Sequence, residues 1–293
     1  LGHPSDRPTP DRAMPAGRTA DRQTATRQPR LSAGRARAVG LPTRGTTNPN
    51  RLRRMDNWLT ATQADRLRLD PSGAPLVIDL GFGDSPVTVL ELQDRLRPIR
   101  PDVRLLGLEI DPERVAAAAP ASRAGLSFGR GGFELAGERA LLVRAANVLR
   151  QYPESAVAPA WQRMTEQLLP GGAVVEGTCD EWGRRGSWVL LEPTGPVSLT
   201  LSCRLTHLNR PSDVADRLVK ALIHRNVAGT AIHALLRAMD RAWDRHAGLA
   251  NFGSRQRWQA MCAELSGEWP VLSTARRHRF GELTVAWPAV APD

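Results

Sequence analysis

The chain contains few cysteines and no long apolar run. Its three cysteines, Cys179, Cys203 and Cys262, are scattered over 293 residues, which excludes a disulfide framework. No Cys/His spacing is typical of a zinc site, so we predict no metal. No stretch approaches the roughly 18 consecutive apolar residues of a membrane span, and the first residues lack the apolar core of a signal peptide. These absences predict a globular protein of the cytoplasm with no membrane partner.

Positive charge is concentrated at one end of the chain. The net charge is +10, and residues 1–54 hold twelve arginines and three aspartates, a net charge of +9, which leaves +1 for residues 55–293. Residues 1–45 are rich in Pro, Arg, Thr and Gly and poor in apolar residues, so we predict a disordered tail. Such a tail could hold RNA through phosphate contacts, or it could be a dispensable extension, which we favour.

The most informative stretch is Leu76-Val-Ile-Asp-Leu-Gly-Phe-Gly-Asp-Ser85. Its apolar run is typical of a parallel strand that is buried on both faces. Gly81 and Gly83 then permit a sharp turn and a close approach of the backbone to a ligand. Ser85 is suited to cap a helix with Pro86 at its first position, so that free N–H groups would point back at the ligand. The stretch predicts a strand, a nucleotide-binding turn and a helix.

A dinucleotide-binding loop is the first alternative for this turn. That loop requires a small residue at its sixth position, where this chain has Pro86. The next apolar run, Arg104–Glu109, ends in an acid 26 residues after Gly83, where doubly wound folds place a ribose-binding carboxylate. Asp111 and Pro112, which follow, are interpreted as the cap and first residue of a helix.

Four stretches, in the correct order and spacing, resemble the motifs of the class I methyltransferases that use S-adenosylmethionine (SAM). They are Asp79-Leu-Gly-Phe-Gly83, the acid Glu109, Ala145-Ala-Asn-Val-Leu-Arg-Gln-Tyr152 and Leu168-Leu-Pro-Gly-Gly-Ala-Val-Val175. The resemblance covers roughly residues 70–192. It implies an α/β fold with a doubly wound, mostly parallel, seven-stranded Rossmann-like sheet and an antiparallel last strand. It also implies SAM as the methyl donor and S-adenosylhomocysteine as the product.

The resemblance implies a set of cofactor-binding residues. We favour a ligand-facing Asp79, because an acid that ends an apolar strand has little structural use, and a Glu109 that accepts the ribose hydroxyls. The adenine contact stays unassigned, because residues 128–133 lack the acid that the family often has there. The full set is Asp79, Gly81, Phe82, Gly83, Ser85, Glu109 and Asn147.

Structural order is predicted to begin near Gly45. Asn50 is suited to cap a helix whose apolar stripe is formed by Leu52, Met55 and Leu59, at spacings of three and four. In the resembled family a helix at this place often covers the cofactor and the substrate. Residues 46–203 are therefore predicted to form a SAM-binding core with an N-terminal lid helix.

The chain after residue 203 goes beyond the minimal fold. Just before it, the apolar runs Ser187–Leu191 and Val197–Cys203 predict a hairpin or two successive strands. We interpret residues 204–250 as a helical insertion that covers the substrate, and residues 251–293 as a final helix and strand that return to the core. The expected elements are helices at roughly 213–226, 230–248 and 254–265 and a strand at 282–287.

The catalytic candidates are Asn147, Cys179, Asp180 and Glu181. Cys179 stands in Gly177-Thr-Cys-Asp-Glu-Trp182, and RNA cytosine-C5 methyltransferases place a nucleophilic Thr-Cys after strand five. Those enzymes also carry a Pro-Cys after strand four, where this chain has Ala-Ala-Asn, so we favour a Cys179 that is not a nucleophile. Asn147 could face the acceptor, and Asp180 and Glu181 are predicted to line its pocket. The substrate-binding candidates are Thr47, Asn48, Arg51, Tyr152 and Arg184.

Three functions are consistent with these patterns. The first is a SAM-dependent methyltransferase with an unidentified acceptor, for which we favour a small molecule over RNA. The second is a methyltransferase of ribosomal or transfer RNA that uses the basic tail for affinity. The third is a non-catalytic cofactor-binding or RNA-binding protein with this fold. The sequence predicts neither the acceptor atom nor the oligomeric state.

Overall fold

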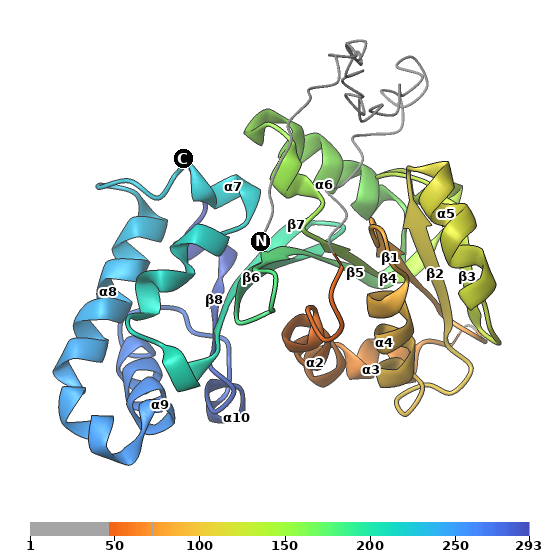
Figure 1. Cartoon of the computed structure of the whole chain (residues 1–293). Helices are drawn as coiled ribbons and strands as arrows, with labels where there is room; N and C mark the ends of the chain where they lie inside the picture. Colours follow the sequence, from red (N-terminus) through yellow and green to blue (C-terminus); the bar gives the residue numbers. More distant parts are fainter. Residues whose placement is uncertain (1–46, 72, 293) are drawn as a thin grey trace, which may run out of the picture.

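A computed structural model of the chain describes residues 47–71 and 73–292. The tail predicted for residues 1–45 lies outside the described residues. The described chain forms one sheet with the strand order β3-β2-β1-β4-β5-β6-β7-β8 (Figure 1). The strands are β1 (Leu76–Leu80), β2 (Arg104–Glu109), β3 (Leu126–Arg130), β4 (Ala140–Ala146), β5 (Leu168–Cys179), β6 (Arg185–Glu192), β7 (Gly195–Cys203) and β8 (Glu282–Ala286).

Helices cover both faces of the parallel strands (Figure 1). Side chains of β1 alternate between two apolar clusters, since Val77 packs in the cluster of α2, α3 and α4 while Ile78 packs in the cluster of α6. Burial on both faces explains the continuous apolar run of this strand. The helices of this part are α2 (Arg53–Thr62), α3 (Ala64–Leu69), α4 (Val87–Leu96), α5 (Pro112–Ala118) and α6 (Val157–Glu166).

The strand order confirms the predicted doubly wound core. Strands β3, β2, β1, β4 and β5 are parallel, and the order reverses between β1 and β4, which makes this the switch point of the sheet. The sheet has eight strands rather than seven, and β6, β7 and β8 each run antiparallel to the strand before them. A short turn joins β6 to β7, where Gly195 has a φ of 118°, so the predicted hairpin is confirmed.

The C-terminal helices lie beside β8 at the far edge of the sheet (Figure 1). The predicted helix at 213–226 is wrong: a 3₁₀ segment, η6 (Pro211–Arg217), precedes the short α7 (Lys220–Ile223). Leu218 and Val219 between them are extended and fully buried, so the packing of these two side chains in the core overrides the local helix pattern. The predictions near 230 and 254 are confirmed. The helices that follow are α8 (Ala231–Arg245), α9 (Ser254–Leu265) and α10 (Ala275–His278).

The residues predicted to begin helices are confirmed in part. Asp111 caps α5 through a hydrogen bond from the Glu113 N–H at 2.9 Å, as expected. Asn50 is not the cap of α2, because its φ of 62° places it in a turn and the helix begins only at Arg53. Pro86 takes the cap position of α4, while the Ser85 hydroxyl accepts the Val87 N–H at 3.3 Å.

Candidate functional site

The glycine loop after β1 is fixed on the end of β2. The φ angles of Gly81 and Gly83 are 75° and 81°, a region that glycine occupies without strain. The Gly81 N–H donates to the Leu108 carbonyl at 2.7 Å, and the Gly83 N–H donates to Oε2 of Glu109 at 3.0 Å. The Phe82 ring is buried edge-on against Phe128, with centroids 5.3 Å apart, so its side chain is part of the core.

The Glu109 carboxylate joins the ends of two neighbouring strands. It is 1% exposed, and Oε1 accepts the Ile110 N–H at 2.9 Å while Oε2 holds the glycine loop. The Arg114 guanidinium lies 3.8 Å away. Oε1 also accepts the Asp111 N–H at 3.5 Å, so these three hydrogen bonds leave one of the roughly four acceptor positions of the carboxylate for a hydroxyl donor. Its predicted ribose contact stays a prediction.

Asp79 is part of a buried ion-pair network. Nε and Nη2 of Arg144 donate to its two oxygens at 2.8 and 2.6 Å, and Nη1 of Arg144 binds Asp56 of α2. Burial lowers the pKa of the Arg144 guanidinium, but the carboxylates of Asp56 and Asp79 raise it by more, so the net shift is upward. The expectation that the acid has little structural use is wrong, because Asp79 helps attach α2 to the sheet. Its predicted cofactor contact is untested.

Arg144 and Asp56 were not predicted as functional residues. The sequence signal that could have revealed them is an arginine within the apolar strand β4. A buried charge requires a partner of opposite sign. Asp56 also accepts from Arg95 of α4 at 3.1 Å, so the network connects two helices and two strands.

Asn147 connects the ends of β4 and β5. It has a φ of 62°, and its Oδ1 accepts the Thr178 hydroxyl at 3.0 Å and the Cys179 N–H at 2.9 Å. Its Nδ2 donates to Sγ of Cys179 at 3.5 Å. The side chain is therefore engaged with β5, which is a structural use that the motif did not indicate. Its predicted contacts with cofactor and acceptor remain predictions.

The segment 47–51 crosses the carboxyl end of the sheet. The Thr47 hydroxyl donates to the Phe82 carbonyl at 3.1 Å, next to the glycine loop. At the other end, Asn48 Nδ2 donates to the Glu181 carbonyl at 3.3 Å and Arg51 Nε donates to the Asp180 carbonyl at 3.2 Å. Three predicted substrate-binding residues thus lie at the edge of the sheet where ligands of this fold bind.

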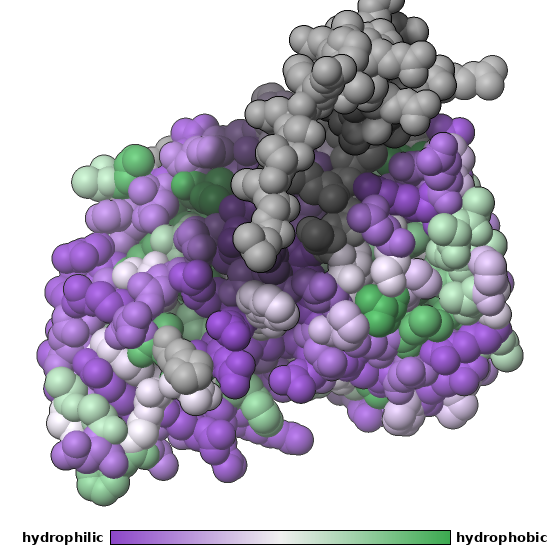
Figure 2. Space-filling view, in the orientation of Figure 1, coloured by the Kyte–Doolittle hydropathy of each residue, from purple (hydrophilic) through white to green (hydrophobic). Residues whose placement is uncertain are grey.

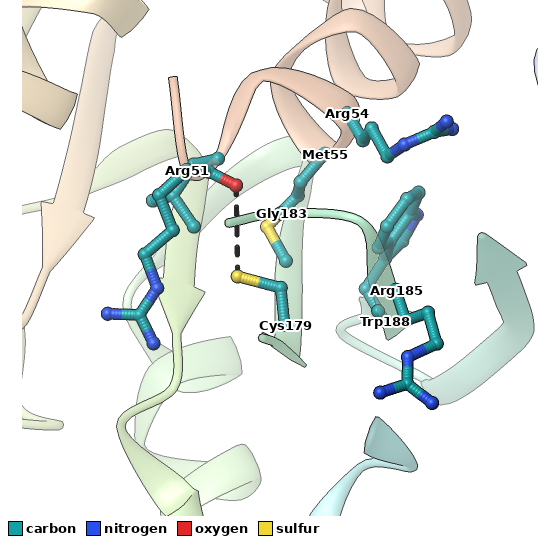
Figure 3. Close-up of a pocket in the computed structure, with 9 residues that line it drawn as sticks. Arg51, Arg54, Met55, Cys179, Gly183, Arg185 and Trp188 are labelled. Carbon is teal, nitrogen blue, oxygen red and sulfur yellow. Dashed lines mark hydrogen bonds between the residues drawn. The ribbon is translucent and has the colours of Figure 1, made fainter. Parts of the chain in front are cut away.

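Cys179 lies behind this segment in a small pocket (Figure 3). It is 8% exposed, and its thiol donates to the Arg51 carbonyl at 3.8 Å. Burial raises the pKa of the Cys179 thiol, although Asn147 and Arg51 oppose the shift. A nucleophilic cysteine is a thiolate at neutral pH, so these surroundings favour a packing role.

Asp180 holds the turn that leads into β6. Its Oδ1 accepts the N–H groups of Trp182 at 3.0 Å and Arg184 at 2.8 Å, and Oδ2 accepts that of Arg185 at 3.1 Å. Asp180, Glu181 and Arg184 line one pocket of about 430 Å³ together with residues of η6, and their predicted role in binding an acceptor stays a prediction. With its carboxylate engaged in three hydrogen bonds, Asp180 is poorly suited to act as a base.

Tyr152 and Phe133 pack edge-on, with ring centroids 5.3 Å apart. Tyr152 is half-buried and does not line the pocket of about 430 Å³. Its predicted contact with substrate is untested.

A larger cleft, of about 1100 Å³, lies between α2 and the segments around α9 and α10. No sequence motif predicted it, because its residues come from five separate parts of the chain. Its arginines are Arg53, Arg54, Arg184, Arg204, Arg255, Arg276, Arg277 and Arg279.

No protein-family model and no curated protein matches the chain. The CcbJ methyltransferase from Streptomyces caelestis resembles part of it, at 19% identity over 53% of this chain and 65% of that chain, with a TM-score of 0.33. The sugar N-methyltransferase KedS8 from Streptoalloteichus sp ATCC 53650 matches at 17% identity over 50% and 62% of the two chains, with a TM-score of 0.32. Human N-acetylserotonin methyltransferase, solved with SAM, matches at 23% identity over 46% and 40%, with a TM-score of 0.29. The chain spans less than two thirds of each of these structures.

The strand order β3-β2-β1-β4-β5 of the core is that of a doubly wound, Rossmann-like fold. The resemblance stated from the sequence is thereby confirmed at the level of the fold. Within the described residues, no cluster of three or more His, Cys, Asp or Glu side chains is arranged to hold a metal ion. No helix of residues 47–71 and 73–292 has both the length and the apolar character needed to cross a membrane.

Proposed function

We propose that this protein transfers a methyl group from SAM to an acceptor. The observation that carries the proposal is the glycine loop, whose Gly83 N–H binds Glu109 at the end of the adjacent strand. The loop follows β1, one of the two strands of the switch point, and Glu109 ends the neighbouring β2, at the edge of the sheet where open α/β folds bind their ligands.

The residues at the switch point fit such a donor. Gly81 and Gly83 expose main chain without side chains, and Glu109 has acceptor capacity for a ribose. Helix α4 begins just after the loop, and because the Ser85 hydroxyl caps its Val87 N–H, it would favour a bound anionic group through the positive end of its dipole. SAM, when bound, supplies an electrophilic methyl group on a positively charged sulfur.

The residues of the chain then act mainly by holding the acceptor. Methyl transfer by in-line displacement gains chiefly from proximity and orientation, and a base is needed only where the acceptor loses a proton. We therefore propose no catalytic base. The segment 47–51 and the loop 180–185 contact each other through Arg51 and Asp180, and we propose that they position the acceptor.

A small molecule and RNA are both candidate acceptors. The pocket beside Asp180 has a volume of about 430 Å³, within the usual range for small-molecule sites. RNA is favoured by a different observation, the arginines of the larger cleft. We propose a cytoplasmic location, because the three cysteines are free rather than paired.

Isothermal titration calorimetry with SAM and S-adenosylhomocysteine tests the donor site. We expect binding by the full chain and a loss of at least tenfold in affinity for Glu109→Gln, because the amide no longer accepts as a carboxylate does. Glu113→Gln is the matched control, since Glu113 is exposed in the first turn of α5. Absence of SAM binding by the unmodified protein would overturn the proposal.

Transfer itself is measured with SAM that carries a radioactive methyl group. Label that accumulates in the RNA fraction or in the small-molecule fraction of a cell extract identifies the acceptor class. Binding of SAM with no labelled fraction would favour the non-catalytic protein.

A further inference from the structure

The large cleft contains an excess of unpaired positive charge. Its one acid, Glu282, is buried and already bound to Nε and Nη2 of Arg277, both at 2.7 Å. Within the described part of the chain, six other arginines of the cleft are exposed and have no carboxylate within salt-bridge distance. They are Arg53, Arg184, Arg204, Arg255, Arg276 and Arg279.

The positive charge of the cleft is higher than the net charge of residues 55–293 would suggest. Residues 55–293 have a net charge of only +1, yet five of the six exposed arginines belong to them. Their charge is thus balanced by acids elsewhere, and the cleft concentrates a positive potential that attracts anions. Figure 2 shows a largely hydrophilic surface over the C-terminal helices, of which α9 and α10 contribute residues to the cleft.

Exposed aromatic rings also line the cleft. Of the large hydrophobic residues that are exposed in the described chain, three are aromatic, and all three line this cleft. Trp182 is 67% exposed, Phe252 is 74% exposed and Phe280 is 55% exposed. Such rings are normally buried, so their exposure between arginines indicates a ligand with flat apolar faces and negative charge.

We propose that this cleft binds a single-stranded nucleic acid, with phosphates on the arginines and bases stacked on Trp182 and Phe252. Alternating phosphates and unstacked bases match arginines interleaved with exposed rings. A small molecule with one phosphate would occupy only a few of the six arginines. Nearly all basic residues of the chain are arginine, with Lys220 the only lysine, and guanidinium groups also stack on bases.

The cleft adjoins the pocket of about 430 Å³, because Trp182, Arg184 and Arg204 line both. Arg54 and Gly183 line both the cleft and the small pocket of Cys179. Arg54 donates to the Phe280 carbonyl at 2.7 Å, which connects α2 to the opposite wall. A strand in the cleft would pass beside the loop 180–185. Binding there does not depend on the methyl-transfer proposal, although together they would make the nucleic acid the acceptor.

Fluorescence anisotropy of the full chain with a labelled uridylate dodecamer tests the cleft. The cleft variant is Arg53→Gln, Arg255→Gln and Arg276→Gln, and its matched control is Arg104→Gln, Arg163→Gln and Arg241→Gln, three exposed arginines outside the cleft. Both triple variants remove the same charge, and both keep the basic tail. We expect a weaker complex for the cleft variant and a fall of about 2 in the slope of log affinity against log salt. Equal binding by the two triple variants would overturn the proposal.

Aromatic substitutions test the stacking part. We expect Trp182→Ala and Phe252→Ala each to weaken binding at least about fivefold, whereas Leu69→Ala, an exposed residue outside the cleft, leaves it unchanged. Inorganic polyphosphate, which has no bases, should be insensitive to these aromatic changes. If the nucleic acid is equally insensitive, the cleft is a general polyanion site and the proposal fails. A thymidylate dodecamer distinguishes DNA from RNA, and SAM calorimetry on the same variants detects a separate failure of the donor site.

Discussion

The two halves of the sheet differ in what their sequences reveal. In the parallel half, residues 47–179, short motifs identify the turn between β1 and α4 and the acid of β2. In the antiparallel half, residues 180–292, no motif stands out, yet most residues of the arginine-lined cleft are there. The parallel half uses one backbone geometry that many proteins share, whereas the antiparallel half forms its surface from scattered side chains. A donor site is therefore easier to recognise than the surface that selects an acceptor.

The largest effect is expected in the parallel half, from Arg144→Met. The change leaves the buried carboxylates of Asp56 and Asp79 without their shared partner, which costs about 3–5 kcal/mol of unfolding free energy. Urea unfolding followed by circular dichroism measures this loss. Arg104→Met, at an exposed position on β2, serves as the control and should change stability little. A similarly small loss for Arg144→Met would show that the network does not attach α2 to the sheet.

Glu176 lies on β5, where the two halves meet. Burial raises the pKa of this carboxyl to about 8, although the Trp161 N–H at 3.3 Å opposes the shift. The folded state therefore keeps a proton that the unfolded chain releases above its ordinary pKa of 4.5, so stability falls as the pH rises from about 4.5 to about 8. Glu176→Gln should remove this fall and stabilise the protein at pH 7 by on the order of 1–3 kcal/mol. Thermal unfolding across this pH range tests the prediction, and an unchanged slope in the variant would contradict it.

The third prediction is that each half of the sheet binds a different ligand. Glu109→Gln should weaken SAM binding at least tenfold, about 1.4 kcal/mol, and leave the uridylate dodecamer bound as before. The triple substitution of Arg53, Arg255 and Arg276 should do the reverse. Calorimetry measures SAM binding, and anisotropy measures dodecamer binding, by the Glu109 variant and by the triple arginine variant. Loss of both ligands in either protein would mean that the halves are coupled rather than separate.

The smallest effect is expected from Cys179→Ser. Because burial raises the pKa of the thiol, a thiolate is disfavoured and methyl transfer should change by less than about twofold. Transfer of labelled methyl groups at saturating SAM measures this. A complete loss of transfer, with SAM binding retained, would restore the nucleophile hypothesis.

Sequence patterns predicted the core well, because parallel strands and glycine turns follow local rules. The strands around Gly81 and Glu109, the hairpin and α9 were predicted within a few residues. The helix at 213–226 was wrong, because the burial of Leu218 and Val219 overrides local helix patterns.

The roles of motif residues were harder to predict than their places. Asp79 was expected to face a ligand, but its partner Arg144 is 65 residues away in the sequence. The cleft was missed for the same reason, since Arg53 and Arg276 approach each other only in the folded chain. Contacts between residues distant in sequence have no local signature.

The buried network of Asp56, Arg144 and Asp79 also bears on how ligands enter and leave. Swinging α2 away from the sheet would separate Arg144 from Asp56 inside the core, so we expect this helix to remain a fixed wall during turnover. The segment just before it lies at the surface, where its hydrogen bonds include those of Thr47, Asn48 and Arg51 to carbonyl oxygens and that of the Asn50 N–H to Glu91 at 2.7 Å. We therefore expect a ligand to enter and leave past this segment at the rim, while the helix behind it stays in place.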